Sequence, residues 1–254
     1  MPTAERATPP SRPAEVFEGH WRPAPAQVRV GPEDVHAWLL HADVADHLAS
    51  LSGVLSAEEA ERAARAATPM ERRRRTVRSV WRQCVLARYR DGSPAAVRFR
   101  RSPLGALELD PPAGLTFSTS HAGGVSVLVI GRDRRLGIDL EPVSAVAQIE
   151  EIAEGYLPVE QVQRIRRRPP HRRGEEWVRL WTELEACSKR DGRGLGDLTP
   201  ATAETLLGQT CERVHLRPDT RHAATLVYDG ARARLSCFLF DTGDIQECEP
   251  PLLS

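Results

Sequence analysis

The chain contains 254 residues, enough for one large domain or for two smaller ones of about 100–125 residues each. Hydrophobic residues make up 41% of it, a share typical of globular proteins, and its 35 basic residues balance 35 acidic ones. This neutral charge argues against a surface that attracts nucleic acid or membranes as a whole, and no apolar run is long enough to predict a membrane span.

The first half of the chain predicts a leader, then helices. Residues 1–29 contain six prolines and no periodic apolar pattern, so we expect a disordered leader that is not a secretory signal. Residues 34–40 fit a strand or a short helix equally well. A capping-box pattern at 56–59 predicts a helix to about residue 67, and apolar positions three and four apart predict an arginine-rich amphipathic helix over 70–89.

The rest of the chain alternates between strand and helix patterns. Apolar residues alternate or run together over 97–140, which predicts a small sheet with at least one hairpin. Helical patterns follow over 146–166 and 175–190, with a loop expected over the basic stretch 168–174, and strand-like segments over 223–228 and 234–240. Helices precede strands in both halves, and this order predicts an α+β fold of two similar lobes.

The cysteines indicate a reducing compartment. They are odd in number and lack the CxxC or Cys/His spacing of zinc sites: Cys84, Cys187, Cys211, Cys237 and Cys248. We therefore expect free thiols in a cytoplasmic protein, with neither a zinc site nor a disulfide framework.

Two short segments carry side chains suited to metal or phosphate chemistry. The sequence SHAGG at 120–124 precedes an apolar strand, and GIDLE at 137–141 lies on the next predicted strand. Strand residues two apart share a face, so Asp139 and Glu141 present paired carboxylates. Mg²⁺ is the hard, oxygen-binding cation that would neutralise such a pair. A solvated acidic edge is the alternative, and for Asp-x-Glu alone it is the commoner one.

A third segment, WTELEACSK at 181–189, is predicted to be helical. Trp181, Glu185 and Lys189 are spaced by four and share one side of this helix. Taken alone, Glu185 and Lys189 are more often an ordinary surface ion pair, but the neighbouring apolar stripe favours a position at the edge of a cleft. Lys189 is also the only lysine among the 35 basic residues.

Taken together and in this order, the three segments resemble the motifs of the 4′-phosphopantetheinyl transferases. The resemblance is strongest to the larger, two-lobed type that acts on carrier proteins of secondary metabolism. The arginine-rich helix at 70–89 is similar to a helix of that family's N-terminal lobe, so the resemblance covers roughly residues 34–240.

This resemblance implies a fold and a metal site. The fold is a pseudo-twofold pair of α+β lobes, at 30–135 and 136–254, with coenzyme A in the cleft between them. Asp139, Glu141 and Glu185 would hold Mg²⁺, which places the metal site in the C-terminal lobe.

The resemblance also implies a reaction. The enzyme would transfer 4′-phosphopantetheine from coenzyme A to a serine hydroxyl of an apo acyl or peptidyl carrier protein, releasing adenosine 3′,5′-bisphosphate. Glu185 would be the general base and Lys189 would neutralise phosphate charge. The residues expected to bind coenzyme A are Arg73, Gly105, Ser120, His121 and Lys189. We expect a monomer that binds neither nucleic acid nor membranes.

The chain departs from the family pattern in places. Leu184 stands where the family has a lysine, Gly105-Ala106-Leu107 replaces a Gly-Lys-Pro turn, and Ser118 and Ala122 replace an asparagine and a serine. The alternative is therefore a non-catalytic relative that binds coenzyme A thioesters or loaded carrier proteins. A nucleic-acid binder that uses the arginine runs at 72–75 and 164–173 is a third class, but these runs lack interleaved aromatics.

Overall fold

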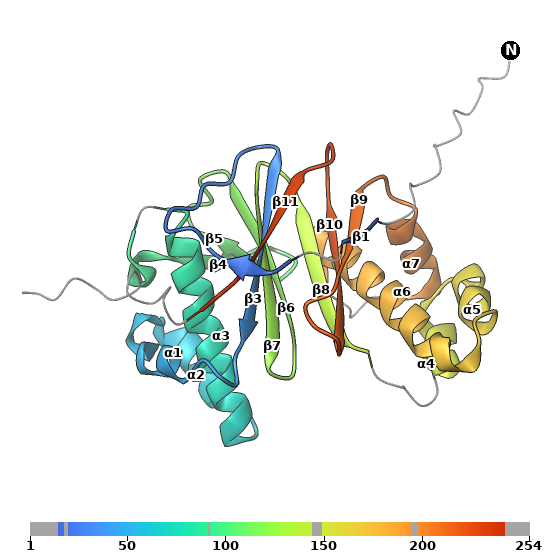
Figure 1. Cartoon of the computed structure of the whole chain (residues 1–254), viewed down its shortest axis with the longest axis horizontal. Coiled ribbons are helices and arrows are strands. Elements are labelled where there is room, and N and C mark those ends of the chain that lie inside the picture. Colours follow the sequence, from blue (N-terminus) through green and yellow to red (C-terminus); the bar gives the residue numbers. More distant parts are fainter. Residues whose placement is uncertain (1–14, 18–19, 91, 144–148, 195–197, 242–254) are drawn as a thin grey trace, which may run out of the picture.

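The computed structural model describes residues 15–17, 20–90, 92–143, 149–194 and 198–241. Helices and strands are combined in an α+β architecture of four layers (Figure 1). Two sheets lie in the middle, helices α1–α3 cover the outer side of one sheet, and helices α4–α7 cover the outer side of the other. The predicted fold class is confirmed.

The strands form two larger sheets and a short hairpin. The first sheet has the order β2 (Arg22–Pro23), β11 (Arg234–Leu239), β3 (Asp34–His41), β7 (Val125–Arg132) and β6 (Leu115–Ala122). The second has the order β1 (Glu15–Phe17), β9 (Glu212–Leu216), β10 (His222–Tyr228) and β8 (Leu136–Pro142). The hairpin pairs β4 (Phe99–Arg101) with β5 (Leu107–Leu109).

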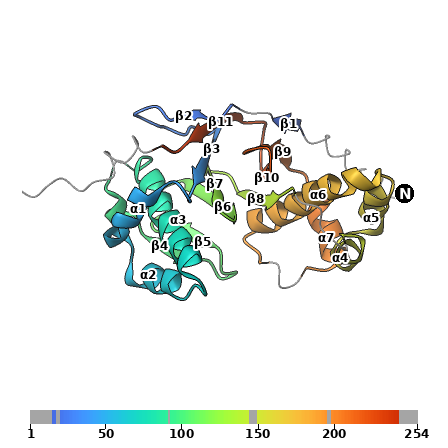
Figure 2. The ribbon, with the colours of Figure 1, turned by 60° about the horizontal axis from the view of Figure 1, so that its bottom comes forward.

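The helices divide between the two outer layers, as Figure 2 shows from a second direction. Those beside the first sheet are α1 (Asp46–Ser50), α2 (Ala57–Ala64) and α3 (Pro69–Ala87), with short 3₁₀ turns at Ser52–Val54 and Pro94–Ala96. Those beside the second sheet are α4 (Ile149–Tyr156), α5 (Val159–Arg166), α6 (Pro170–Arg190) and α7 (Pro200–Leu207).

The ambiguous segment at 34–40 is strand β3, and its burial explains why its sequence does not alternate with polar residues. Val35, Ala37 and Leu39 face the core between the two sheets. Trp38 and Leu40 face the core beneath helices α1–α3. A strand that is buried on both faces needs apolar residues at nearly every position.

Two expectations are corrected by the elements observed. The basic stretch 168–174 is not wholly a loop, because α6 begins at Pro170, a position where proline's missing N–H costs nothing. In the part of the expected leader that the structure describes, β1 pairs with β9 and β2 pairs with β11. Residues 15–17 and 22–23 are therefore ordered, and Val28 is buried in the core.

The strand pairing crosses the expected boundary between the lobes at residue 135. Strand β11 comes from the C-terminal half but pairs in parallel with β3 of the first sheet. Strand β1 comes from the N-terminus but pairs in parallel with β9 of the second sheet. The division of the chain into lobes at 30–135 and 136–254 stays a prediction. If it holds, each lobe contains one strand from the other end of the chain, β11 in the first sheet and β1 in the second.

Gly137 allows helix α6 to lie directly on strand β8. A Cβ atom added to this glycine would lie 2.1 Å from the carbonyl oxygen of Ala186 and 2.6 Å from the backbone nitrogen of Arg190. Both neighbours are helix backbone, so the whole helix would have to shift. The glycine of the GIDLE segment thus sets the distance between the helix and the strand that carry the acidic residues.

We expect Gly137→Ala to destabilise the protein by about 1–3 kcal/mol or more, because the added methyl group overpacks a rigid contact. The matched control is Gly155→Ala in α4, where no heavy atom lies within 4 Å of the added Cβ. That change should be neutral or stabilising by up to about 1 kcal/mol, since alanine is the better helix former. Denaturant unfolding measures both, and equal free energies of unfolding for the two variants would contradict this role of Gly137.

Candidate functional site

Three carboxylates meet where strand β8 faces helix α6. Asp139 and Glu141 lie on the face of β8 opposite Ile138 and Leu140, which point into the core between the sheets. Glu185 approaches from α6, and one oxygen of each carboxylate lies within 4.8 Å of the others. The strand and helix spacings thus bring together the three residues expected to form a metal site.

A lysine and a serine complete this cluster. The Nζ atom of Lys189 lies 2.5 Å from Oδ1 of Asp139 and 3.8 Å from Oε2 of Glu185. Ser120 on β6 donates a hydrogen bond of 2.8 Å to the same Asp139 oxygen and accepts one of 3.1 Å from Lys189. Residues from β6, β8 and α6 therefore converge at the junction of the two sheets.

The electrostatics of the cluster fit a divalent cation. Burial and the charge of Asp139 raise the pKa of Glu141 to about 7 and that of Glu185 to about 8. Asp139 is 1% exposed, and its buried Oδ2 atom has no hydrogen-bond partner among the described residues. A hard cation such as Mg²⁺ would supply both the missing contact and the missing positive charge.

A pocket of about 270 Å³ opens beside this cluster, between β6 and the helices α2 and α3. It is lined by Ser120 and His121 together with Arg75 and Arg78 of α3. Partial desolvation and the nearby Arg78 guanidinium lower the pKa of His121 to about 4, so this side chain is neutral at pH 7. The pocket combines cations with a neutral imidazole, a set that suits phosphate oxygens.

A second pocket, of about 230 Å³, lies on the other side of the lysine. Lys189 and the β4–β5 turn at Gly105 line it, together with Ser118 of β6. Gly105 has a φ of +88°, a conformation that side chains rarely adopt, so glycine suits this turn. Gly105 and Lys189 thus line the same pocket, and their roles in binding coenzyme A stay predictions.

Arg73 is the expected site residue that the structure places elsewhere. Its guanidinium pairs with Asp46 and donates to the carbonyl oxygen of Ala42, and among the described residues it lines neither pocket. Arg75 and Arg78 of the same helix line the His121 pocket instead, and the expected role of Arg73 in binding coenzyme A stays a prediction. Their spacing of three on a helix was a signal that they share one face.

Two departures from the family pattern have a structural role here. The Ser118 hydroxyl accepts a hydrogen bond of 3.2 Å from the backbone N–H of Ile138 and so ties β6 to β8. Leu184 is fully buried in the apolar core between α6 and its neighbouring helices. A leucine at this position contributes to the packing of the helix that carries Glu185 and Lys189.

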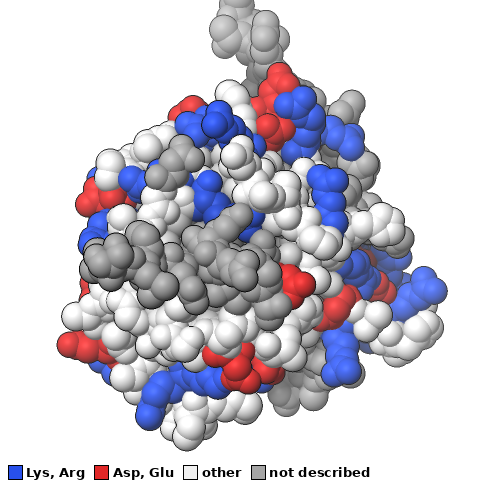
Figure 3. All heavy atoms as spheres, turned by 60° about the vertical axis from the view of Figure 1, so that its left-hand side comes forward, with Lys and Arg blue, Asp and Glu red and all other residues white. Residues whose placement is uncertain are grey.

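The charge on one face of the molecule is mixed. On the described parts of the face shown in Figure 3, basic and acidic side chains are interspersed around largely uncharged surface. The described parts of that face show no continuous basic stripe of the kind that binds a nucleic-acid backbone. Among the described residues, no helix combines the length and apolarity that crossing a bilayer requires.

Comparison with known proteins identifies two relatives. The chain is 28% identical over 182 residues to the 4′-phosphopantetheinyl transferase HetI of Nostoc sp., a match covering 70% of this chain and 77% of the relative. It is 25% identical over 144 residues to slr0495 of Synechocystis sp., provisionally named as a transferase of the same kind, covering 56% of this chain and 58% of that protein. No protein-family model matches the chain.

Proposed function

Because this chain belongs to the 4′-phosphopantetheinyl transferase superfamily, we propose that it transfers 4′-phosphopantetheine from coenzyme A to a serine hydroxyl of an apo acyl or peptidyl carrier protein. The observation that carries this proposal is the buried cluster of three carboxylates, with Lys189 against it and a cation-lined pocket beside it. Phosphoryl transfer depends mainly on positioning and on charge neutralisation, and this cluster offers groups for both.

Asp139, Glu141 and Glu185 are the residues that would hold Mg²⁺. The bound ion would neutralise their mutual repulsion and the charge on the diphosphate of coenzyme A. Support for this assignment comes from the proximity of their oxygens and from the unpartnered Oδ2 atom of Asp139.

In the proposed reaction, Glu185 accepts the proton of the carrier serine hydroxyl. The serine oxygen forms a bond to the β-phosphorus of coenzyme A, and the bond from that phosphorus to the bridging oxygen breaks. The leaving group is adenosine 3′,5′-bisphosphate. The positive charge of a bound Mg²⁺ would favour the ionised form of Glu185, the form that accepts a proton.

The cations and hydroxyl groups near the cluster would bind coenzyme A. Lys189 would contact the diphosphate, with Gly105 on one side of it and Ser120 and His121 on the other. In the His121 pocket, the lining residues Trp81 and Ser126 each have a buried polar atom with no hydrogen-bond partner among the described residues. These atoms suit the polar nucleotide end of coenzyme A.

We place this activity in a cytoplasmic, monomeric enzyme of secondary metabolism. None of the cysteines that the structure describes forms a disulfide, which agrees with a reducing compartment. Zero net charge and the mixed charge on the described parts of the face in Figure 3 give no support to a nucleic-acid partner.

The proposal is tested by incubating the protein with Mg²⁺, coenzyme A and a panel of apo carrier proteins, followed by intact-mass spectrometry of the carriers. We expect one carrier to gain a single phosphopantetheine, and EDTA to abolish the gain. If a control transferase modifies the same carriers and this protein modifies none, the proposal is wrong. Binding of coenzyme A without turnover would then favour the non-catalytic alternative.

Two neighbouring arginines allow a sharper test of coenzyme A binding. We expect Arg75→Ala to weaken binding by about tenfold or more, the loss of one charge-assisted hydrogen bond, because Arg75 lines the His121 pocket. Arg73→Ala is the matched control, since the same charge is removed from a side chain held by Asp46 outside the pocket. Calorimetric titration compares them, and a larger effect of Arg73→Ala would return the assignment to Arg73.

A further inference from the structure

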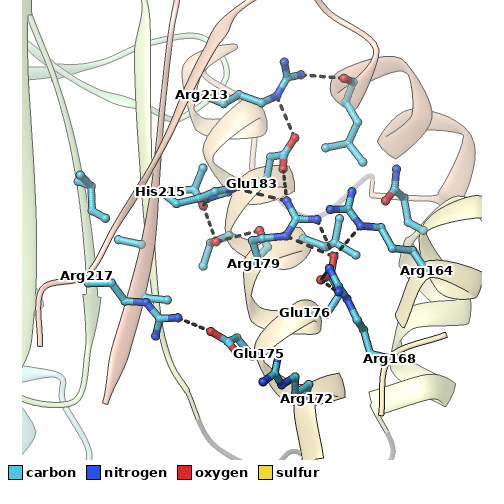
Figure 4. A pocket seen from close by; sticks show the side chains of 18 residues that line it. Arg164, Arg168, Arg172, Glu175, Glu176, Arg179, Glu183, Arg213, His215 and Arg217 are labelled. Atoms are coloured by element: carbon cyan, nitrogen blue, oxygen red, sulfur yellow. Dashed lines mark hydrogen bonds and ion pairs between the residues drawn. The ribbon is translucent and has the colours of Figure 1, made fainter. Parts of the chain in front are cut away.

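A third and larger cavity lies on the outer side of the second sheet, apart from the two pockets beside Lys189. Its volume is about 560 Å³, within the range of small-molecule sites, and its walls come from α5, α6, β9 and β10 (Figure 4). It shares no lining residue with the pockets described above. The proposed transfer reaction gives this cavity no role.

The cavity is strongly basic. Its lining includes six arginines, namely Arg164, Arg168, Arg172, Arg179, Arg213 and Arg217. Against these stand three glutamates, Glu175, Glu176 and Glu183, which leaves an excess of three positive charges (6 − 3). In a chain whose net charge is zero, this excess is a local concentration of cations.

Buried acids hold several of these arginines in place. Glu176 is 6% exposed and pairs with Arg164 at 2.7 Å, Arg168 at 2.9 Å and Arg179 at 2.8 Å. Figure 4 shows these guanidinium groups converging on this carboxylate from α5, from α6 and from the connection between the two helices. Burial alone would raise the pKa of Glu176, but its arginine partners lower it, so it stays ionised and keeps the cluster fixed.

Some polar groups of the cavity are left without a partner. Among the described residues, the Arg172 side chain has no ion pair, and Figure 4 draws it beside Glu175 with no contact marked. The buried Oε1 atom of Gln161 also has no hydrogen-bond partner there. Arg164 and Arg168 keep about half of their side-chain surface exposed, at 48% and 47%. Donors are therefore still available to a ligand.

The inner wall of the cavity is neutral and ordered. The His215 Nδ1 atom lies 3.0 Å from the Thr225 hydroxyl, which lies 2.7 Å from the Thr182 hydroxyl. Desolvation and the nearby Arg179 lower the pKa of His215 to about 4, so it adds no charge at pH 7. Leu180 and Leu216 add apolar surface. The cavity thus combines a cationic rim with a wall that is partly apolar.

We propose that this cavity binds a small organic polyanion that carries two or three negative charges, as phosphate or carboxylate groups, on a short apolar body. A ligand with two or three negative charges would balance the excess of three positive charges in the lining. The planar guanidinium groups of the arginines can pair with two oxygens of a phosphate or of a carboxylate. The site is separate from the carboxylate cluster and does not depend on transfer activity. It also gives the arginine run at 164–173 a role other than that of a solvated helix face.

Calorimetric titration in metal-free buffer tests this proposal, with inorganic triphosphate as the phosphate probe and tricarballylate as the carboxylate probe. We expect the wild-type protein to bind at least one of them, and the probe that binds more tightly identifies the charged group. Arg172→Ala should weaken that binding by about tenfold or more. Because Arg172 has no ion pair among the described residues, the variant should unfold at the wild-type temperature.

The matched control is Arg167→Ala, which removes the same charge from an exposed side chain that does not line the cavity and contacts Gln163. It should leave binding unchanged, and Arg75→Ala should also leave it unchanged if the probe occupies this cavity. The proposal is overturned if the wild-type protein binds neither probe at millimolar concentration. It is equally overturned if Arg172→Ala binds as tightly as wild type, or if both arginine variants of this region weaken binding alike.

Discussion

Glu185→Gln should lower the rate of phosphopantetheine transfer by about 10²–10⁴-fold, the range typical for loss of a general acid–base group. Glutamine has the same shape but cannot accept the proton of the carrier serine, and it removes one of the three carboxylates of the cluster. The initial rate of carrier modification, measured by intact mass with Mg²⁺ and saturating coenzyme A, reports the loss.

This variant should not be an unfolding mutant. Glu185 is only 8% exposed, and Asp139 lies close enough to raise its pKa, so removal of its charge relieves repulsion in the metal-free protein. Glu160→Gln, which makes the same change at an exposed position of α5, should transfer at the wild-type rate. Wild-type turnover by Glu185→Gln would show that Glu185 is neither the base nor a required ligand.

The second large effect is on stability as a function of pH. We expect Glu185→Gln to become progressively more stable than wild type as the pH rises from about 5 to about 8 in metal-free buffer. The pKa of Glu185 rises on folding from its ordinary value of 4.5 to about 8. Between these values the folded wild-type protein binds more protons than the unfolded chain, so its free energy of unfolding falls as the pH rises.

The comparison with the variant is necessary because other groups titrate in the same range. The pKa values of His121 and His215 are lowered to about 4, and these side chains therefore make stability rise with pH below about 6.5. They are present in both proteins, so their effect cancels in the difference. Denaturant unfolding at pH 5, 6.5 and 8 in EDTA measures that difference, and a constant difference would contradict the raised pKa of Glu185.

Mg²⁺ should reverse the order of stability at pH 8. A ligand that binds the folded state stabilises it in proportion to RT ln(1 + [L]/Kd), and the cluster with all three carboxylates should bind the ion more tightly. The wild-type protein should therefore gain more from millimolar Mg²⁺ than Glu185→Gln does. Equal gains in the two proteins would place the ion elsewhere.

The sequence was most informative where a short-range rule decides the geometry. The alternation of side chains along a strand put Asp139 and Glu141 on one face, and the helical repeat put Glu185 and Lys189 on another. The structure brings these four residues together because Gly137 lets the helix lie against the strand. The roles of these residues in binding and catalysis stay predictions.

Features that depend on distant contacts could not be predicted in this way. The parallel pairing of β11 with β3 joins residues about 200 positions apart, and nothing in either segment specifies its partner. Which of the arginines at 72–75 lines the His121 pocket could not be predicted for a related reason, because the direction of each side chain depends on how α3 packs against its sheet. In the folded protein, Arg73 forms an ion pair with Asp46, whereas Arg75 lines the His121 pocket.

The beginning of α6 was missed because its local sequence argues against a helix. Two prolines and a run of arginines at 168–173 have the composition of a loop, yet proline is well tolerated at the first position of a helix. Contacts with other segments stabilise the helix, because its buried Glu176 forms ion pairs with Arg164 of α5 and with Arg168 in the connection that follows α5. The cavity above the second sheet could therefore be seen only in the folded chain.

The most direct test of the account is to quantify both products of a single reaction with an apo carrier, coenzyme A and Mg²⁺. The account predicts one phosphopantetheine on the carrier serine for each adenosine 3′,5′-bisphosphate released, with both products absent in EDTA. Release of the bisphosphate without carrier modification, or modification that persists in EDTA, would contradict a metal-dependent transfer to the carrier at Asp139, Glu141 and Glu185.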